Sequence, residues 1–366
     1  MTLLDLLSLA AGAALLGLAL RTDLARRRAP RLPAPVAGAA DVTVLLPVRD
    51  EEQNALPCVD ALLAQTVQPR VRVIDDASTD RTVELLESRL PGFPRLSLLS
   101  AGPLPAGWRG KVHALATGIE GVESPWVLST DADARLHPEA LGRALAAALD
   151  RRLDGLSIGG RQEARGLTEN LLIPPVFALL DFLLGDWGRA ADGGTRVASG
   201  QFILFRRAAL EDCGGFAPLR TETLDDVALF ARFQEASYRT GFFRAPDLLA
   251  VRMYRGAREV TRGWRRILAV YLGRRPGVVA AALLVLLLPP AAGLAELAAG
   301  RPLPAALLWA TGVAAGLLCR ASGRQTLAYS LLYPLDALLL AGVLALAVVD
   351  RRRKRLTRWK GREIEI

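Results

Sequence analysis

The sequence has few of the residues that hold disulfide-rich or zinc-bound folds together. Its 366 residues include 3 cysteines and 2 histidines. Cys58, Cys213 and Cys319 are far apart and form no CxxC pair, which argues against a structural zinc site and is consistent with a reducing compartment. Hydrophobic residues make up 51% and charged residues 23% of the chain, so it is neither a disordered nor a collagen-like protein.

Lysine is also scarce, which draws attention to one lysine in particular. Of the 46 basic residues, only Lys111, Lys354 and Lys360 are lysines, and the last two lie near the C-terminus. Lysine is a compact point charge that suits phosphate, whereas the arginine guanidinium is a wider planar fork. The segment 107–111 (GWRGK) therefore indicates a phosphate-binding lysine, and a surface lysine without a ligand is the alternative.

The excess positive charge is confined to two short stretches. The chain has 46 basic and 37 acidic residues, a net charge of +9. Residues 21–31 carry five arginines and one aspartate, and residues 350–366 carry eight basic and three acidic residues, so these stretches account for the whole excess. Both adjoin apolar runs, and aromatic residues make up only 6% of the chain. The charge therefore indicates membrane flanks, and we expect no nucleic-acid partner.

A helix needs about 20 residues to cross a hydrocarbon core, and four apolar runs have this length or come close to it. They are residues 6–20, 277–295, 302–319 and 325–349, the last interrupted only by Asp336. In the first run the basic cluster follows the apolar residues, whereas in a signal peptide it precedes them. We therefore expect an uncleaved anchor at residues 1–22, two or three crossings within residues 277–349, and basic flanks on the cytoplasmic side.

The C-terminal runs create a conflict of topology. Three complete crossings would carry the basic tail, residues 350–366, to the side opposite a cytoplasmic central domain, whereas the positive-inside rule places such a tail in the cytoplasm. Either the rule fails locally or one run is re-entrant or interfacial. The run at 277–295, which contains Pro289 and Pro290, is the best candidate for an incomplete crossing.

The central part of the chain alternates between strand and helix patterns. Strands are predicted at 42–46, 71–74, 96–99 and 126–130, with helices at 51–65, 79–90 and 110–120 between them. This order predicts an α/β fold with a mainly parallel sheet at residues 41–255, after a basic and Pro/Ala-rich linker at residues 23–40. In such sheets, ligands bind beyond the carboxyl ends of the strands.

Carboxylates follow three of these strands. The residues that stand there are Pro47 and Glu51 after the first strand, Asp75 and Asp76 after the second, and Asp131 and Asp133 after the fourth. Like charges this close are unfavourable unless a cation or hydrogen-bond donors compensate them. The alternate carboxylates of an Asp-x-Asp segment suit Mg²⁺ or Mn²⁺, with substrate phosphates completing the coordination. For any single pair, a turn or a helix cap is the alternative.

A further acidic pair stands at the start of a predicted helix. Residues 200–205 (GQFILF) have the pattern of a strand, and residues 221–230 (TETLDDVALF) place Asp225 and Asp226 at the beginning of an amphipathic helix. Acidic residues are favoured there by the helix dipole. A catalytic base at the mouth of the site is the other interpretation, and the pattern alone does not choose between the two.

Six segments, taken in order, resemble those of one enzyme family. They are VTVLLPVRDEEQN, VRVIDDASTD, GWRGKVHAL, STDADA, SGQFILFRR and LDDVALF. Together they resemble the family 2 glycosyltransferases, which have the GT-A fold. Within that family the sequence is most similar to the membrane-anchored branch that acts on lipids, comprising ceramide glucosyltransferase-like enzymes and bacterial carotenoid and hopanoid glycosyltransferases. The resemblance covers about residues 40–270, and the C-terminal apolar runs also fit that branch.

The resemblance implies a role for each of the candidate residues. Asp76, and with it Asp75, would contact the base or ribose of a nucleotide sugar, and Lys111 would lie near its diphosphate. Asp131 and Asp133 match the metal-binding motif, with Asp133 as the direct ligand. Three further residues complete the set: Pro47 and Glu51 near the nucleotide, and Gln201 in the strand that lines the acceptor side. Asp226 matches the general base of the family.

The sequence departs from the family pattern at two places. Ala77 stands where the family often has glycine. Residues 262–266 (RGWRR) stand where processive members have a Q/RxxRW motif, and the tryptophan comes before the last arginines. This argues against a polymerase of the cellulose or hyaluronan type. Arg265 or Arg266 could still meet the diphosphate.

Two segments suggest that the acceptor is a lipid. Residues 171–187 are apolar although they fall inside the predicted catalytic domain, and residues 256–276 are basic with interleaved aromatics. Both suit the bilayer interface. The alternatives are a core helix for the first and a solvated connector for the second.

The expected function is therefore an inverting, metal-dependent transfer of a sugar from a nucleotide sugar, such as a UDP-sugar, to a lipid hydroxyl. We expect it at the inner membrane of the cell, in a multi-pass protein whose catalytic domain is cytoplasmic. Three alternatives are transfer to a polyprenyl phosphate, which needs no base, a nucleotidyltransferase, which would release pyrophosphate, and a degenerate, non-catalytic membrane scaffold.

Overall fold

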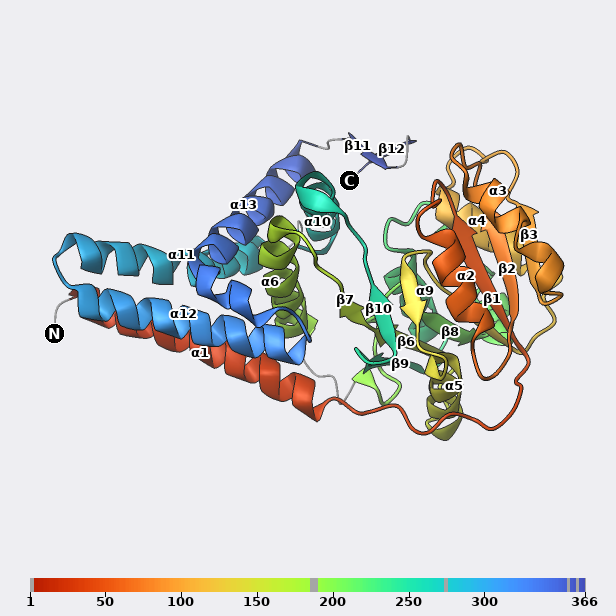
Figure 1. The fold of residues 1–366 in the computed structure, drawn as a ribbon, viewed down its shortest axis with the longest axis horizontal. Coiled ribbons are helices and arrows are strands. Elements are labelled where there is room, and N and C mark those ends of the chain that lie inside the picture. Colours follow the sequence, from red (N-terminus) through yellow and green to blue (C-terminus); the bar gives the residue numbers. More distant parts are fainter. Residues whose placement is uncertain (1–2, 185–189, 273–275, 354–355, 360–361, 366) are drawn as a thin grey trace. The chain divides into compact units, whose positions relative to one another are not determined.

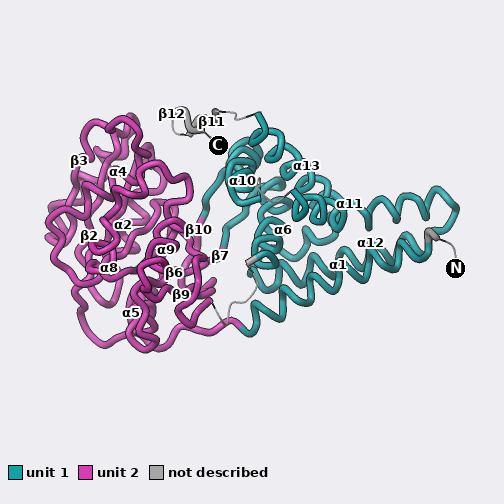
Figure 2. Tube along the Cα trace, turned by 180° about the vertical axis from the view of Figure 1, so that it is seen from behind, with its two compact units in different colours: residues 1–28, 162–185, 252–366 teal, residues 29–161, 186–251 magenta. Residues whose placement is uncertain are grey.

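The computed structural model describes residues 3–184, 190–272, 276–353, 356–359 and 362–365. The chain divides into two compact units (Figure 2). The sheet unit comprises residues 29–161 and 186–251, and the helical unit comprises residues 1–28, 162–185 and 252–366. The chain therefore passes between the units at several places, and each unit is assembled from segments that are far apart in the sequence.

The sheet unit is built on a seven-stranded, mainly parallel sheet. Its strands, in spatial order, are β3 (Leu96–Ser100), β2 (Arg70–Asp75), β1 (Val42–Val48), β4 (Trp126–Ser129), β8 (Ile203–Arg206), β6 (Gly155–Gly159) and β9 (Thr240–Arg244). Strand β8 runs antiparallel to β4 and β6, while the other neighbouring pairs are parallel. The predicted α/β fold with a mainly parallel sheet is thus confirmed. A second, three-stranded sheet has the order β5 (Ala134–Leu136), β10 (Leu249–Val251) and β7 (Arg161–Gln162).

Helices between the strands complete the sheet unit. They are α2 (Ala55–Leu63), α3 (Thr82–Glu87), α4 (Gly110–Ile119), α5 (Ala140–Asp150), α8 (Arg207–Asp212) and α9 (Asp225–Glu235), with the 3₁₀ turns η1 (Leu90–Gly92) and η2 (Ala217–Leu219). Helices α2 and α3 begin later than the sequence pattern predicts. The reason is that side chains take the backbone donors of these segments: Thr82 accepts the Glu51 N–H at 2.7 Å, and Asp80 accepts the Thr82 N–H at 3.0 Å.

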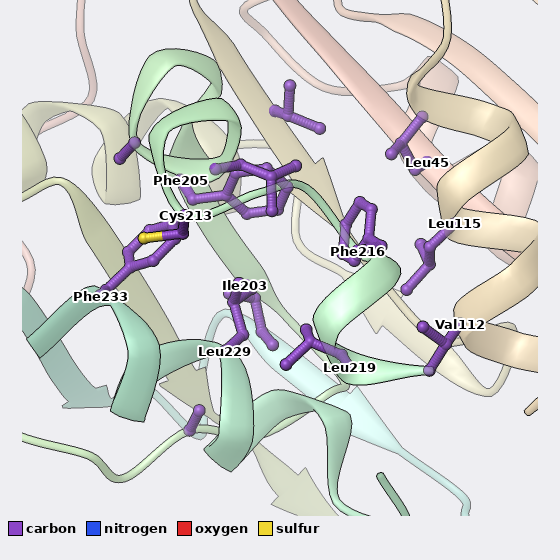
Figure 3. Packing of buried hydrophobic residues seen from close by; sticks show 14 of the residues in the cluster. Leu45, Val112, Leu115, Ile203, Phe205, Cys213, Phe216, Leu219, Leu229 and Phe233 are labelled. Carbon is purple, nitrogen blue, oxygen red and sulfur yellow. The ribbon is translucent and has the colours of Figure 1, made fainter. Parts of the chain in front are cut away.

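The sheet is covered by an apolar core that explains its strand pattern. Six of the seven residues of β1 are buried, as expected for a strand with both faces covered. Leu45 of β1, Leu115 of α4, Phe205 of β8 and Phe233 of α9 belong to one buried cluster (Figure 3). Helix α4 approaches the sheet closely at Gly118, where a Cβ would lie 2.6 Å from the Cδ1 of Ile74.

The helical unit contains most of the long helices of the chain (Figure 1). They are α1 (Leu3–Arg28), α6 (Leu167–Leu184), α10 (Gly256–Leu272), α11 (Pro276–Ala298), α12 (Pro302–Ser322) and α13 (Tyr333–Arg352), with η3 (Leu327–Leu332) and the hairpin strands β11 (Leu356–Trp359) and β12 (Arg362–Glu365). Four segments are long and apolar enough to cross a membrane: Asp5–Arg28, Pro276–Ala298, Pro302–Ser322 and Leu327–Arg352. Helices suited to the membrane are therefore present near both termini, as predicted.

Two boundaries differ from the sequence expectation. Helix α1 continues through the first residues of the expected linker to Arg28, because basic residues in a last helical turn are favoured by the helix dipole. Helix α6 belongs to the helical unit rather than to the domain expected at 41–255. Its Leu172 and Val176 pack in a cluster with Leu268 of α10, and an apolar run does not by itself specify the surface that it contacts. Residues 185–187 and 273–275 of the segments expected at the interface lie outside the described residues.

Candidate active site

A lysine bridges two carboxylates at the carboxyl edge of the large sheet. Lys111 is in the first turn of α4, Asp131 follows β4 and Asp225 begins α9. The Nζ of Lys111 lies 3.0 Å from the Oδ1 of Asp131 and 3.3 Å from the Oδ2 of Asp225. About a third of the Lys111 side chain remains accessible, at 31%. The structure therefore brings together three residues that are separated by long stretches of sequence.

Asp226 lies at the edge of this cluster, and both of its carboxylate oxygens accept backbone hydrogen bonds. Its Oδ2 accepts the N–H of Gly200 at 2.8 Å, and its Oδ1 accepts the N–H of Val227 at 2.9 Å. The first bond joins the start of α9 to the turn before β8. Gln201, the next residue in that turn, is buried, and its carbonyl accepts the hydroxyl of Thr130 at 2.7 Å. The orientation of the Asp226 carboxylate is thus fixed by the backbone.

Gly200 borders the cluster, and the sequence analysis did not identify it. A Cβ at this position would lie 2.7 Å from the Nζ of Lys111, 3.3 Å from the Oδ2 of Asp131 and 3.7 Å from the Oδ2 of Asp226. A larger residue would therefore displace the lysine. The one feature of the sequence that could have identified Gly200 is its position in the segment 199–201 (SGQ), directly before a buried strand. No spacing rule connects that position to Lys111.

The cluster shifts the proton affinity of its members. Burial, reinforced by the negative charges of Asp131 and Glu51, raises the pKa of Asp133 to about 7. Burial and the neighbouring Asp225 raise the pKa of Asp226 to about 6. Burial opposes the charge on Lys111, but the surrounding carboxylates outweigh it and raise the pKa of this lysine above its usual range. The site thus has an excess of negative charge that a further cation would relieve.

Asp133 has the features expected of a metal ligand. Its Oδ1 is buried and has no hydrogen-bond partner, which is costly for a carboxylate oxygen unless a ligand completes it. Within the described part of the chain, no three His, Cys, Asp or Glu side chains are grouped so that they could hold a metal ion. Asp131 and Asp133 therefore fit Mg²⁺ or Mn²⁺ if substrate phosphate oxygens supply the remaining ligands, since these hard cations prefer oxygen.

The loops after β1 and β2 are joined by hydrogen bonds. The N–H of Asp76 donates to the carbonyl of Val48 at 2.9 Å, and the guanidinium of Arg49 donates to the carbonyl of Asp76 at 2.6 Å. Asp75 and Asp76 are both buried, and the Asp75 carboxylate accepts the N–H of Ser78 at 3.1 Å. These bonds hold the two predicted nucleotide-binding carboxylates at the strand ends.

The remaining predicted residues of this region lie beside the same loops. Pro47 pairs in register with Ile74 at the end of β1. Glu51 follows β1, and its Oε2 accepts the amide of Asn54 at 2.8 Å. Ala77, which stands where the family often has glycine, has a φ of 56°. The backbone here therefore has the left-handed conformation that glycine adopts more readily, and this chain adopts it with alanine.

Arg265 and Arg266 lie on α10 in the helical unit. Two guanidinium nitrogens of Arg265 contact the Oδ2 of Asp350, at 2.6 and 3.0 Å. Burial lowers the pKa of Arg266, which lies beside the hydroxyl of Tyr254. Trp264 is buried in the apolar cluster of the helical unit, where its ring packs edge-on against Phe177. A contact of either arginine with a diphosphate stays a prediction.

Comparisons with known proteins identify the fold. Residues 43–214 match the family described as Glycosyl transferase family 2. The fold is similar to that of the mannosyltransferase PcManGT from Pyrobaculum calidifontis, whose structure is a complex with GDP-Man and Mn²⁺; the two are 24% identical over 96% of this chain and 99% of that one, with a TM-score of 0.59. The structure of S. aureus TarS 1-349 is 16% identical over 88% of this chain and 95% of that one, with a TM-score of 0.42. A comparison with curated protein sequences found no match to the chain.

The matched residues include β1, the loop after β2, Lys111, the Asp131–Asp133 segment and Gly200. The mainly parallel sheet is that of a GT-A domain, as the sequence resemblance implied. The chain is a glycosyltransferase in which residues 43–214 match family 2 and the sheet unit has the GT-A fold.

Proposed function

We propose that this glycosyltransferase moves a sugar from a nucleoside diphosphate sugar to a hydroxyl group of a membrane lipid, with inversion at the anomeric carbon. The observation that carries this proposal is the cluster in which Lys111 bridges Asp131 and Asp225 while Asp226 is held at its edge. Such a cluster combines groups that can bind a diphosphate with a carboxylate that can accept a proton. The four membrane-suited segments of the same chain supply the reason for a lipid acceptor.

The donor would bind along the carboxyl edge of the sheet. Asp75 and Asp76 are buried at the end of β2 and would contact the nucleoside, with Pro47 and Glu51 beside them. The ammonium of Lys111 would approach the diphosphate and compensate its negative charge. A UDP-sugar remains the expected donor, and a GDP-sugar is the donor that the PcManGT complex suggests testing beside it.

A divalent metal would be held by Asp133, with Asp131 next to it. When bound, it would neutralise the charge that develops on the departing nucleoside diphosphate. Lys111 would stabilise the same charge from the start of α4, and because it is fixed in advance by two carboxylates, little reorganisation is needed during the reaction. Glu51 would add to the negative field that favours a cation at Asp133.

Asp226 would act as the general base. With a pKa near 6 it is ionised at neutral pH, yet it is a stronger base than an ordinary aspartate. Its two backbone hydrogen bonds hold the carboxylate in place. It would take the proton of the acceptor hydroxyl as that oxygen attacks the sugar from the side opposite the leaving group. A single displacement of this kind inverts the anomeric configuration and requires no covalent nucleophile on the protein.

The proposal is tested by incubating the full-length protein, in membranes, with UDP- and GDP-hexoses and a total lipid extract. Release of nucleoside diphosphate that depends on the lipid, together with an alkali-stable glycolipid, is the expected result. Release of pyrophosphate would indicate a nucleotidyltransferase, and a product in which the sugar is attached through phosphate would indicate a polyprenyl phosphate acceptor. Either outcome would contradict the proposed reaction.

The pH dependence of the rate should report the protonation of Asp226. A base with a raised pKa is lost as the pH falls, so we expect kcat/KM to decline below about pH 6. In Asp225→Asn the neighbouring negative charge is removed, so the pKa of Asp226 should fall and the decline should move to lower pH. The measurement is a pH profile from about pH 5 to pH 8 for both proteins. If the decline in Asp225→Asn occurred at the same pH as in the unsubstituted protein, or at higher pH, Asp226 would not have this role. The control is Asp60→Asn, whose carboxylate forms an exposed ion pair with Arg89.

Gly200→Ala should lower activity without unfolding the protein. The added Cβ would lie 2.7 Å from the Nζ of Lys111, so the ammonium group must shift from its present position. A displacement of this size near the reacting groups is expected to lower kcat/KM by roughly 10–100-fold. The matched control is Gly194→Ala, where a Cβ would meet no atom within 4 Å. Equal activity of the two variants, with similar melting temperatures, would show that Gly200 does not limit the position of Lys111.

A further inference from the structure

The last apolar run of the chain does not form one continuous helix. Residues 325–349 have the length of a complete crossing. In the structure this run begins with η3, Leu327–Leu332, and α13 then starts at Tyr333, directly before Pro334. The change of helix type at a proline divides the run into two segments that can point in different directions.

Three other helices define the two ends of the helical unit. Arg301, at the start of α12, pairs with Asp5 near the start of α1, and Glu296 near the end of α11 accepts the hydroxyl of Ser8 at 2.9 Å. We call this the loop end, because the turn between α11 and α12 lies there. Helix α12 therefore runs in the same direction as α1, and α11 runs in the opposite direction. Figure 1 shows these three helices side by side.

The opposite end is where the chain continues into the sheet unit, and we call it the junction end. Arg26, in the last turn of α1, donates to the carbonyl of Cys319 and the hydroxyl of Ser322, each at 2.7 Å. The C-terminal ends of α1 and α12 thus lie next to each other. Helix α11 starts at this end, because Glu296, near its other end, lies at the loop end. By sequence the run at 277–295 is the best candidate for an incomplete crossing, whereas α11 is a single helix from Pro276 to Ala298 that reaches the loop end despite its two prolines.

η3 runs from the junction end back along α12. A Cβ at Gly316 would lie 3.3 Å from Ser330, and one at Gly312 would lie 2.1 Å from the ring of Tyr333. Successive residues of the segment thus contact successively earlier residues of α12. From Ser322 to Gly312 the axis of α12 advances roughly 15 Å, which is about half of a hydrocarbon core. The segment therefore reaches about the middle of the helical bundle.

Helix α13 returns to the junction end. Its Asp336 pairs with Arg320 near the end of α12, at 2.6 Å. Near its own end, Asp350 pairs with Arg265 of α10 at 2.6 Å, and Arg351 donates to the carbonyl of Ala269 on the same helix. Val279, at the start of α11 and so at the junction end, lies in one buried cluster with Leu344 and Ala347 of α13. Figure 1 shows α13 leaving the direction of α12 and lying beside α10.

The buried charges agree with this path. Asp336 and Arg320 are 5% and 1% exposed, and Arg320 also donates to the carbonyl of Asn170 on α6. Such a pair is tolerated at membrane depth because each charge has its partner within the protein. Non-helical backbone at that depth is likewise tolerated where it is buried in protein, and Ser330 of η3 is fully buried.

We infer that residues 325–353 form a re-entrant hairpin, in which η3 descends along α12 and α13 returns to the junction end. Among the described helices, α1, α11 and α12 alone then cross the membrane. The basic residues that begin at Arg351 consequently lie on the same side of the membrane as the arginines at the end of α1. This topology satisfies the positive-inside rule at both basic stretches. It does not depend on the sugar, the metal or the acceptor.

The test is the side from which single cysteines react with a membrane-impermeant maleimide, in the full-length chain in sealed vesicles of each orientation. The three positions are Arg353→Cys after α13, Arg28→Cys at the junction end and Ala299→Cys at the loop end, all exposed. We expect Arg353→Cys to react from the same side as Arg28→Cys and from the side opposite to Ala299→Cys. The unsubstituted chain, whose Cys58 and Cys213 are buried, gives the background.

Two outcomes would overturn the hairpin. Reaction of Arg353→Cys from the side of Ala299→Cys would mean that residues 325–349 cross completely. Reaction of all three cysteines from the same side would mean that α1, α11 and α12 do not cross. A C-terminal fusion to a fluorescent protein that matures only in the cytoplasm gives an independent measurement, because fluorescence is expected only if the tail lies there.

Discussion

Asp226→Asn is expected to abolish most of the sugar transfer. The substitution keeps the size of the side chain but removes its capacity to take a proton, and such a loss lowers kcat by roughly 10²–10⁴-fold. Because Asp226 would act on the acceptor, the KM for the nucleotide sugar should change only a few-fold. The measurement is the steady-state rate of nucleoside diphosphate release with saturating lipid, in the variant and in the unsubstituted protein.

The control for this prediction must separate catalysis from folding. The introduced amide would offer the N–H groups of Gly200 and Val227 one acceptor and one donor in place of two acceptors, so a small drop in melting temperature is expected. The exposed variant Asp60→Asn should leave both rate and stability unchanged. If Asp226→Asn retained nearly normal turnover while folded, the base assignment would be wrong, and a phosphate acceptor, which needs no base, would become the better explanation.

Asp133→Ala is expected to remove both activity and metal binding. The Oδ1 of Asp133 is buried without a partner, and the pKa of the carboxyl is raised to about 7, so a divalent cation would stabilise its ionised form. Loss of a metal that stabilises the leaving group costs several kcal/mol, and we expect a decrease of roughly 10³-fold in kcat. In the unsubstituted protein a chelator should abolish activity, and added Mn²⁺ should restore it.

The metal can also be followed without activity. Paramagnetic resonance of free Mn²⁺ should show binding to the unsubstituted protein in the presence of a nucleoside diphosphate, and weaker binding to Asp133→Ala. The variant should not melt at a lower temperature, because a buried carboxylate beside Asp131 and Glu51 contributes repulsion to the folded protein. Full activity in the presence of a chelator would show that the enzyme works without a metal and that Lys111 alone compensates the diphosphate.

The large sheet and much of the candidate site follow from local patterns. Short apolar runs identify β1, β2, β3 and β4, and carboxylates after parallel strands must meet at one edge. For this reason the sequence predicts Asp75 and Asp131 at the carboxyl edge of the sheet. The contacts between Lys111 and Asp225 and the position of Gly200 could not be predicted in this way, because they depend on how α4, α9 and the turn before β8 pack.

In the helical unit, composition predicts the helices but not how they pack together. An apolar run of suitable length predicts a buried or membrane-spanning helix, but it does not specify the direction of the helix or its neighbours. Helix α6 joins the helical unit through Leu172 and Val176, and α13 turns back because Tyr333 packs on Gly312 and Asp336 pairs with Arg320. These contacts join residues that are far apart in the sequence, so the hydrophobic pattern of a single apolar run cannot predict them.

The most direct test of the account compares lipid extracts by mass from cells with and without the gene. The account predicts that one lipid gains the mass of a single hexose when the protein is present, and that this product disappears in cells that carry Asp226→Asn. Its precursor should accumulate in those cells. An unchanged lipid profile, together with a nucleotide-sugar-dependent product that is soluble in water, would contradict the claim that the acceptor is a membrane lipid.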